Sequence, residues 1–309
     1  MIKICPLGAS MLNTPFTLKK GIDFFKEGKI QFVEVENADL IISGNLNKIL
    51  TTALKFGSAK KYLIWTREPR FSKQFNQTLA YPLLPTVHVM NVYTGIFDNN
   101  YFYVPRLLKE PRLDTGRSLE ASTRRMISLM TYQAGRKWKL IHKGVDIDLC
   151  NLRTRIALKG YDLGLLDIYG KGWPNKISIE NSRGKGWRDK KLHILKHYSF
   201  NLCFENTNWP YYCTEKIWDS IQGGCLPIYY GEGNKIYEDF PRNSFLDYHD
   251  FGAPDLLLDY IQSIREEEFK ERMFLCVNAL KNASRRKQEK DPTQEIFNRT
   301  LLKIRTILQ

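Results

Sequence analysis

The stretch FNLCFENTNWPYYCTEKIWDSIQGGCLPIYYG, residues 200–231, contains the clearest pattern of secondary structure in this sequence. Its apolar run at 200–204 is long enough for a buried strand, and a second such run follows at 226–230. Between them Thr214 is a suitable N-cap, so we expect a helix to begin at Glu215. A strand, a loop, a helix and a second strand in this order indicate a parallel α/β sheet.

Polar side chains of this unit are expected to meet at one edge of the sheet. Glu205 and Asn206 follow the first strand, at the carboxyl edge where open α/β sheets bind ligands. Glu215 and Lys216 stand in the first turn of the helix, whose free N–H groups attract phosphate. A bound anion would explain a cation in this turn, and Glu215 suits sugar hydroxyls. The alternative is an ordinary charged first turn that faces solvent.

These residues resemble, in order and spacing, the signature of the α1,3/4-fucosyltransferases of glycosyltransferase family 10, which use GDP-fucose. The matching positions are Phe204-Glu205-Asn206, Tyr212, Thr214-Glu215-Lys216, Pro227-Ile228-Tyr229 and Gly231, and the likeness continues to Phe251. The resemblance covers the C-terminal half well and the N-terminal half weakly. It departs at Trp209-Pro210, where family members often carry glycine or small residues.

The resemblance implies a GT-B type α/β fold, with two Rossmann-like domains facing a central cleft. It further implies an inverting transfer of L-fucose from GDP-fucose to a hydroxyl of a glycan. We expect an α1,3 linkage to N-acetylglucosamine in a surface glycan, such as a lipopolysaccharide or a glycoprotein. The alternative within this fold is a different sugar-nucleotide donor.

The same resemblance assigns the donor-binding residues. They are Arg155, Glu205, Asn206, Tyr212, Glu215 and Lys216. Arg155 is preferred to Arg153 for the donor phosphates because of its distance before Gly170, although an ordinary surface arginine is the alternative. Tyr212 could equally be a core aromatic. Lysine and arginine would replace a metal ion at the diphosphate, and Asp146-Ile147-Asp148, which matches a DxD metal motif, is assigned no role.

Glu68 is the candidate catalytic base. It follows the expected strand at 62–65, and the family places a glutamate in a matching position, often with one residue between it and a proline. Here Glu68 and Pro69 are adjacent, which shifts the alignment by a residue. The alternatives are a surface glutamate paired with Arg67 or Arg70, and Glu205 as the base.

Composition narrows the class of protein. The chain has 309 residues, of which 43% are hydrophobic, and a net charge of +14. No apolar run is long enough for a membrane span, no signal peptide is expected, and the six scattered cysteines suggest reduced thiols. We therefore expect a cytoplasmic location. Peripheral attachment to the inner face of a membrane is one explanation of the positive net charge. Nucleic-acid binding is the other, but no such motif accompanies the charge.

Alternating elements divide the chain into three parts. Residues 1–117 are expected to form an N-terminal acceptor-binding domain, and residues 118–284 a C-terminal domain that binds GDP-fucose. The charged segment at 108–125 is the candidate linker. Residues 285–309 are expected to form a C-terminal helix that packs on the domains, the alternative being a helix on a membrane surface.

Overall fold

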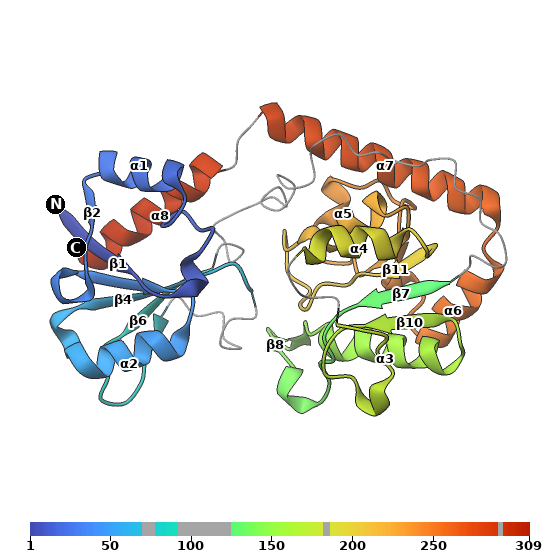
Figure 1. Cartoon of the computed structure of the whole chain (residues 1–309), viewed down its shortest axis with the longest axis horizontal. Coiled ribbons are helices and arrows are strands. Elements are labelled where there is room, and N and C mark those ends of the chain that lie inside the picture. Colours follow the sequence, from blue (N-terminus) through green and yellow to red (C-terminus); the bar gives the residue numbers. More distant parts are fainter. Residues whose placement is uncertain (70–77, 92–124, 182–185, 290–292) are drawn as a thin grey trace. The chain divides into compact units, whose positions relative to one another are not determined.

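The computed structural model describes residues 1–69, 78–91, 125–181, 186–289 and 293–309. The chain divides into two compact units, Met1–Asp98 with Asp291–Gln309, and Asn99–Lys290 (Figure 1). The predicted boundary at 117/118 and most of the candidate linker lie outside the described residues. Each unit is a Rossmann-like α/β domain, so the predicted fold class is confirmed.

The first unit is built on a six-stranded sheet with the order β2-β1-β3-β4-β6-β5. Its strands are β1 (Ile2–Pro6), β2 (Ile30–Phe32), β3 (Leu40–Ser43), β4 (Lys61–Thr66), β5 (Thr78–Leu79) and β6 (Val87–Asn91). All neighbours are parallel except β5 and β6. β3 is buried along its whole length, which is typical of a parallel strand covered on both faces. β2 is short, and a 3₁₀ turn begins soon after it at Val35.

Three helices cover this sheet: α1 (Lys19–Glu27), α2 (Leu46–Phe56) and α8 (Thr293–Leu308). The side chain of Asn45 caps α2 by accepting a hydrogen bond from the N–H of Lys48. α8 packs on α1 and β6, and Trp65 donates its indole N–H to the buried Thr300 at 3.3 Å. The helix expected over 285–309 is divided, since α7 ends at Glu289 and α8 begins at Thr293.

The second unit has a fully parallel five-stranded sheet with the order β10-β7-β11-β12-β13. Its strands are β7 (Met126–Leu129), β10 (Leu166–Tyr169), β11 (Phe200–Leu202), β12 (Leu226–Tyr229) and β13 (Leu246–Asp247). β7, the first strand in the chain, lies between β10 and β11. The direction in which strands are added therefore reverses between β7 and β11, which makes this point the topological switch of the sheet.

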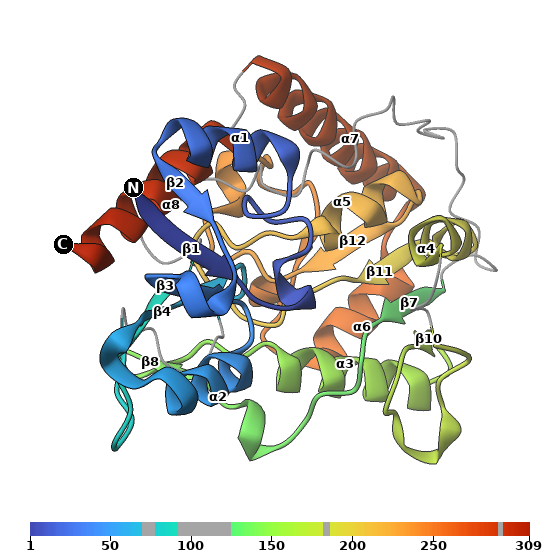
Figure 2. The ribbon, with the colours of Figure 1, turned by 60° about the vertical axis from the view of Figure 1, so that its left-hand side comes forward.

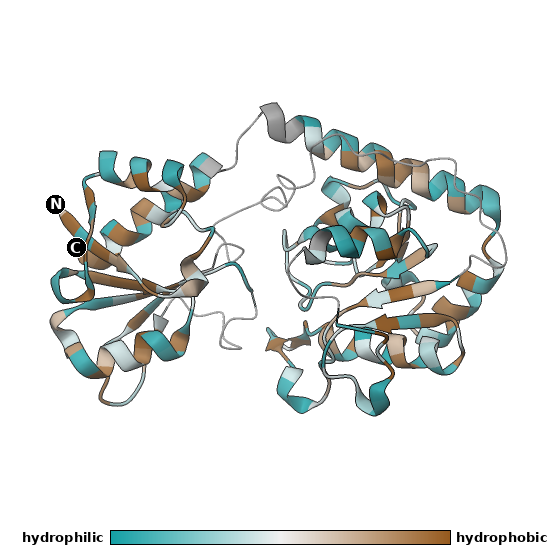
Figure 3. Cartoon of the chain, in the orientation of Figure 1, coloured by the Kyte–Doolittle hydropathy of each residue, from teal (hydrophilic) through white to brown (hydrophobic). Residues whose placement is uncertain are grey.

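Helices cover both faces of the second sheet, as both ribbon views show (Figures 1 and 2). They are α3 (Cys150–Asp162), α4 (Trp187–Leu195), α5 (Glu215–Gln222), α6 (Pro254–Ser263) and α7 (Glu266–Glu289), and a hairpin of β8 (Ile141–His142) and β9 (Val145–Asp146) precedes α3. α3 and α6 pack together on one face, while α5 contacts α4 and α7 on the other. The strands are mostly hydrophobic (Figure 3), and they supply much of a core that includes Phe200, Trp218 and Ile228.

Two further expectations concern cysteines and membranes. All six cysteines lie in the described part of the chain, and each is a buried free thiol. Burial raises the pKa of the Cys203 thiol to about 12, so this thiol stays protonated at neutral pH. Among the helices described, none combines the length and the apolar character needed to cross a bilayer.

Candidate functional site

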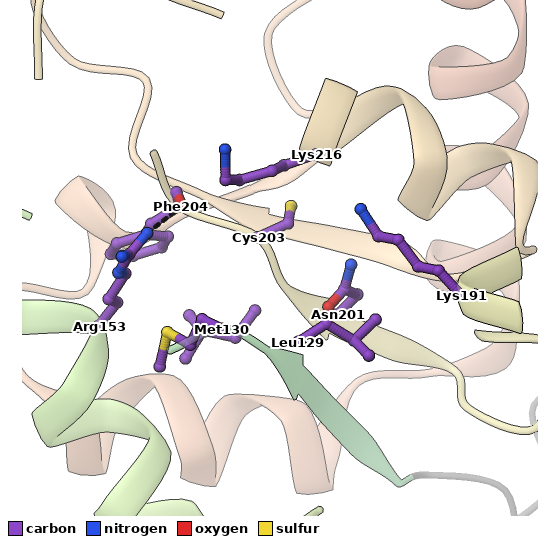
Figure 4. A pocket seen from close by; sticks show the side chains of 9 residues that line it. Leu129, Met130, Arg153, Lys191, Asn201, Cys203, Phe204 and Lys216 are labelled. Carbon is purple, nitrogen blue, oxygen red and sulfur yellow. Dashed lines mark hydrogen bonds between the residues drawn. The ribbon is translucent and has the colours of Figure 1, made fainter. Parts of the chain in front are cut away.

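A pocket opens at the carboxyl ends of β7 and β11, at the topological switch of the second sheet (Figure 4). It is lined by Leu129, Met130, Arg153, Lys191, Asn201, Leu202, Cys203, Phe204 and Lys216. Its volume of about 20 Å³ admits a water molecule or one phosphate oxygen, so the rest of a ligand would lie outside it. Three of the nine lining residues are cations, and each comes from a different helix. This arrangement suits an anion.

Glu205 is a buried residue that contacts the N-terminus of α5. Its side chain is 1% exposed, and Oε1 accepts a hydrogen bond from the N–H of Thr214 at 2.7 Å. Oε2 lies 2.9 Å from the ammonium of Lys216. The helix begins at Glu215 as predicted, but the Thr214 hydroxyl does not cap it, because this hydroxyl donates to Glu205 at 2.8 Å. Glu205 therefore supports Lys216 and the helix N-terminus from a buried position.

The two charged residues of the first turn are kept ionised by their surroundings. Burial favours the neutral form of Glu215, but the charges of Lys216 and Lys191 outweigh it and lower the pKa of Glu215 to about 2. Burial would likewise lower the pKa of Lys216, but Glu205 and Glu215 raise it above its usual value. Both side chains remain partly exposed, so a ligand can reach them.

Arg153, rather than Arg155, reaches the pocket. Arg153 is 6% exposed and donates to the carbonyl of Phe204 at 3.2 Å and to Gln133 Oε1 at 2.6 Å. Its Nε is buried and has no hydrogen-bond partner among the described residues. Arg155 is exposed, does not line the pocket, and places its charge near the phenol of Tyr248. The preference for Arg155 over Arg153 is not supported by this geometry.

Helical spacing could have identified Arg153 from the sequence. On α3 it follows Cys150 by three residues and precedes Ala157 by four, and all three are buried. An arginine on the buried stripe of a helix must find partners inside the protein, whereas Arg155 falls on the solvent side.

The other two predicted donor-binding residues have different surroundings. Asn206 is half-buried, its carbonyl accepts a hydrogen bond from the N–H of Leu149 at 3.1 Å, and its Oδ1 accepts one from Thr207 at 2.8 Å. It thus joins the loop after β11 to the start of α3. Tyr212 is 1% exposed, which agrees with the alternative that it is an aromatic residue of the core.

The Asp146-Ile147-Asp148 motif has a structural role here. Asp146 Oδ1 accepts hydrogen bonds from the N–H groups of Leu140 and Asp148. Asp148 accepts hydrogen bonds from the first two N–H groups of α3, those of Cys150 at 3.0 Å and Asn151 at 3.0 Å. Within the described ranges, no group of three or more histidine, cysteine or acidic side chains is arranged to hold a metal ion.

Gly170 is required by the neighbouring strand. Its φ is +134°, and a Cβ at this position would lie 2.0 Å from the carbonyl oxygen of Met130. Only glycine lets β10 end this close to the backbone that follows β7. This contact explains the residue without any ligand.

Glu68 belongs to the first unit, two residues after the end of β4. It is exposed, and its N–H donates to Thr66 Oγ1 at 3.1 Å. Arg67 donates to the carbonyl of Asn13 at 2.6 Å, and Arg70 lies outside the described residues. The catalytic role of Glu68 stays a prediction.

Lys191 is a pocket residue that the sequence did not reveal. The pair Lys190-Lys191 reads as a solvated basic patch, but only Lys190 is exposed, where it pairs with Glu180 at 2.6 Å. Lys191 is 6% exposed, and its ammonium lies 2.8 Å from Oδ2 of Asp219, which is fully buried. No motif marks this residue, because its burial depends on how α4 packs on α5.

Comparison with known proteins shows a likeness that covers part of the chain. Residues 153–293 match the model described as glycosyltransferase family 10 (fucosyltransferase), C-terminal part. An alpha-(1,3)-fucosyltransferase of Helicobacter pylori is 41% identical over 85 residues, which are 28% of this chain and 17% of that protein. An alpha-(1,4)-fucosyltransferase of Arabidopsis thaliana is 32% identical over 106 residues, 34% of this chain and 26% of that protein. The matches thus span about a sixth to a quarter of the length of these relatives.

Among solved structures, T4 phage β-glucosyltransferase aligns with 97% of this chain and 99% of its own, at a TM-score of 0.51 and 13% identity. At this identity the likeness concerns the fold alone. It supports the predicted GT-B fold.

Proposed function

We propose that this chain is a fucosyltransferase that uses GDP-fucose, because residues 153–293 match the model of glycosyltransferase family 10. In this proposal it moves L-fucose to a hydroxyl of a glycan, with an α1,3 linkage to N-acetylglucosamine as the expected product. The family, and the names of the curated relatives, support this reaction.

One observation carries the proposal. Arg153, Lys191 and Lys216 line a pocket at the topological switch, beside the N-terminus of α5. This edge of a parallel sheet is where α/β domains bind nucleotides, and helix N–H groups and cations suit a diphosphate. Arg153 takes the phosphate role that the sequence assigned to Arg155, because its unpartnered Nε is buried beside the pocket.

The proposed mechanism is a single displacement that inverts the anomeric carbon. Glu68 removes the proton from the acceptor hydroxyl, and the oxygen attacks as the bond to GDP breaks. Lys216 and Arg153 stabilise the negative charge that develops on the diphosphate, so no metal ion is required. Glu215, ionised throughout the neutral range, accepts hydrogen bonds from hydroxyls of the donor.

Incubation with GDP-fucose and a panel of lactosamine-type acceptors tests the proposal. The expected products are a fucosylated glycan of inverted configuration and an equal amount of GDP, in the presence of EDTA. Calorimetric titration with GDP, UDP and ADP tests the donor separately. Folded protein that binds UDP but not GDP would point to the alternative donor, and protein that neither transfers fucose nor hydrolyses GDP-fucose would refute the proposal.

A further inference from the structure

We propose that Lys191, which is paired with Asp219, is a third cation of the donor site and that its charge stabilises the diphosphate of the donor. This inference rests on the proposed function and adds a residue that neither the signature nor the family resemblance includes.

The geometry joins Lys191 to the residues of the phosphate site. Its partner Asp219 stands on α5, three residues after Lys216, so the ion pair links α4 to the helix that carries Lys216. Figure 4 shows both lysine side chains reaching the pocket from different helices, with Asn201 between them and β7. Asn201 is 2% exposed, and its Oδ1 has no partner within the described ranges. The pocket therefore contains polar groups beyond those that the helix contacts need.

Burial of this ion pair is costly for a purely structural link. Removing an ammonium and a carboxylate from water costs several kcal/mol per ion, and apolar residues of similar volume often replace such pairs without loss of stability. Leu195 of α4 also lies close to Gly223 at the end of α5, where an added Cβ would be 2.4 Å from the Cβ of Leu195, so the ion pair is not the sole contact between these described segments. A buried cation that lines a pocket is more readily explained by a ligand of opposite charge.

The charges around Lys216 show why a third cation is useful. Its ammonium lies 2.9 Å from Glu205 and 3.9 Å from Glu215, so two carboxylates already surround this one cation. When the bond from fucose to GDP breaks, the electron pair stays on the diphosphate, which gains one negative charge. Fixed cations in a site shielded from water stabilise that charge most effectively. Lys191 has only one carboxylate within ion-pair distance among the described residues.

The test measures GDP affinity for three variants of the full chain. Lys191→Met with Asp219→Asn removes both buried charges, and we expect GDP to bind about tenfold more weakly. Asp219→Asn alone leaves the cation without its carboxylate, and we expect GDP to bind at least as tightly as to the wild type. Lys190→Met is the matched control, because this neighbour is exposed, and its GDP affinity should be unchanged.

The different expected GDP affinities of Asp219→Asn and of the double variant distinguish an electrostatic role of Lys191 from a structural role of the ion pair. A structural link predicts that Asp219→Asn and the double variant weaken GDP binding alike. The double variant should also show a shallower dependence of GDP affinity on salt, which a packing defect would not cause. Wild-type affinity in the folded double variant, or an equal loss in Asp219→Asn, would overturn the inference alone. Absence of GDP binding by the wild type would instead overturn the proposed function and the inference with it.

Discussion

The ammonium of Lys216 lies 2.9 Å from the carboxylate of Glu205, whose side chain is 1% exposed at the end of β11. The same carboxylate accepts hydrogen bonds from the backbone and hydroxyl of Thr214. One buried acid thus fixes both the N-terminus of α5 and the cation that the proposal places at the phosphates. This relationship makes Glu205 a support of the site.

Glu205→Gln should lower the free energy of unfolding by about 3 kcal/mol, because it leaves the half-buried Lys216 without its closest charge partner. Chemical denaturation checks this value. Glu266→Gln is the matched control, since Glu266 forms an exposed ion pair with Lys270 at 2.6 Å, and it should cost less than about 0.5 kcal/mol. Equal effects of the two substitutions would contradict a supporting role for Glu205.

Arg153 and Arg155 differ in their predicted effect on the donor. Arg153→Met should weaken GDP binding by about ten- to a hundredfold, because it removes a charge-assisted contact with the diphosphate. Arg155 lies two residues further along the same helix, and its side chain is exposed. Arg155→Met should therefore leave GDP affinity nearly unchanged. Calorimetric titration of both variants measures the difference. The reverse order would restore the assignment made from the sequence.

Much of this architecture could be predicted from the sequence. The apolar runs at 200–204 and 226–230 identified β11 and β12, and Thr214 marked the start of α5. These features depend on local pattern. The burial of Arg153 and Lys191 does not, because it depends on which side of α3 and α4 faces the sheet. The family signature identified residues of the loop after β11 and of the first turn of α5. Lys191 comes from α4 and belongs to no motif, so the sequence did not indicate its place in the pocket.

The sequence near the end of the chain contains a signal for two helices in place of one. Residues 285–309 read as one amphipathic helix, yet α7 continues to Glu289 and α8 starts at Thr293. Pro292 immediately precedes α8 in the sequence, and proline is frequent at the start of helices and rare inside them. The residue type therefore favoured a new helix at this position over a continuous one.

The low pKa of Glu215 predicts how stability varies with pH. The pKa in the folded protein, about 2, lies below the value of an unfolded glutamate, so the ionised carboxylate stabilises the fold above the unfolded pKa. That contribution is lost as the pH falls from about 5 toward 2. The difference in unfolding free energy between the wild type and Glu215→Gln should therefore stay constant from pH 8 to pH 5 and shrink below it. Denaturation of both proteins over this range measures the difference, and a change centred near pH 7 would contradict it.

Glu68→Gln should separate chemistry from donor binding. Loss of a general base typically slows transfer by about 10² to 10⁴-fold, whereas GDP affinity should not change, because Glu68 belongs to the first unit and the cationic pocket to the second. Transfer rates at saturating GDP-fucose, with calorimetric GDP titration alongside, measure the two effects. Glu36→Gln is the control, since Glu36 is an exposed acid of the same unit that pairs with Lys55. Transfer by Glu68→Gln at the wild-type rate would show that another group accepts the proton, and a parallel loss of GDP affinity would show that Glu68 acts on the donor.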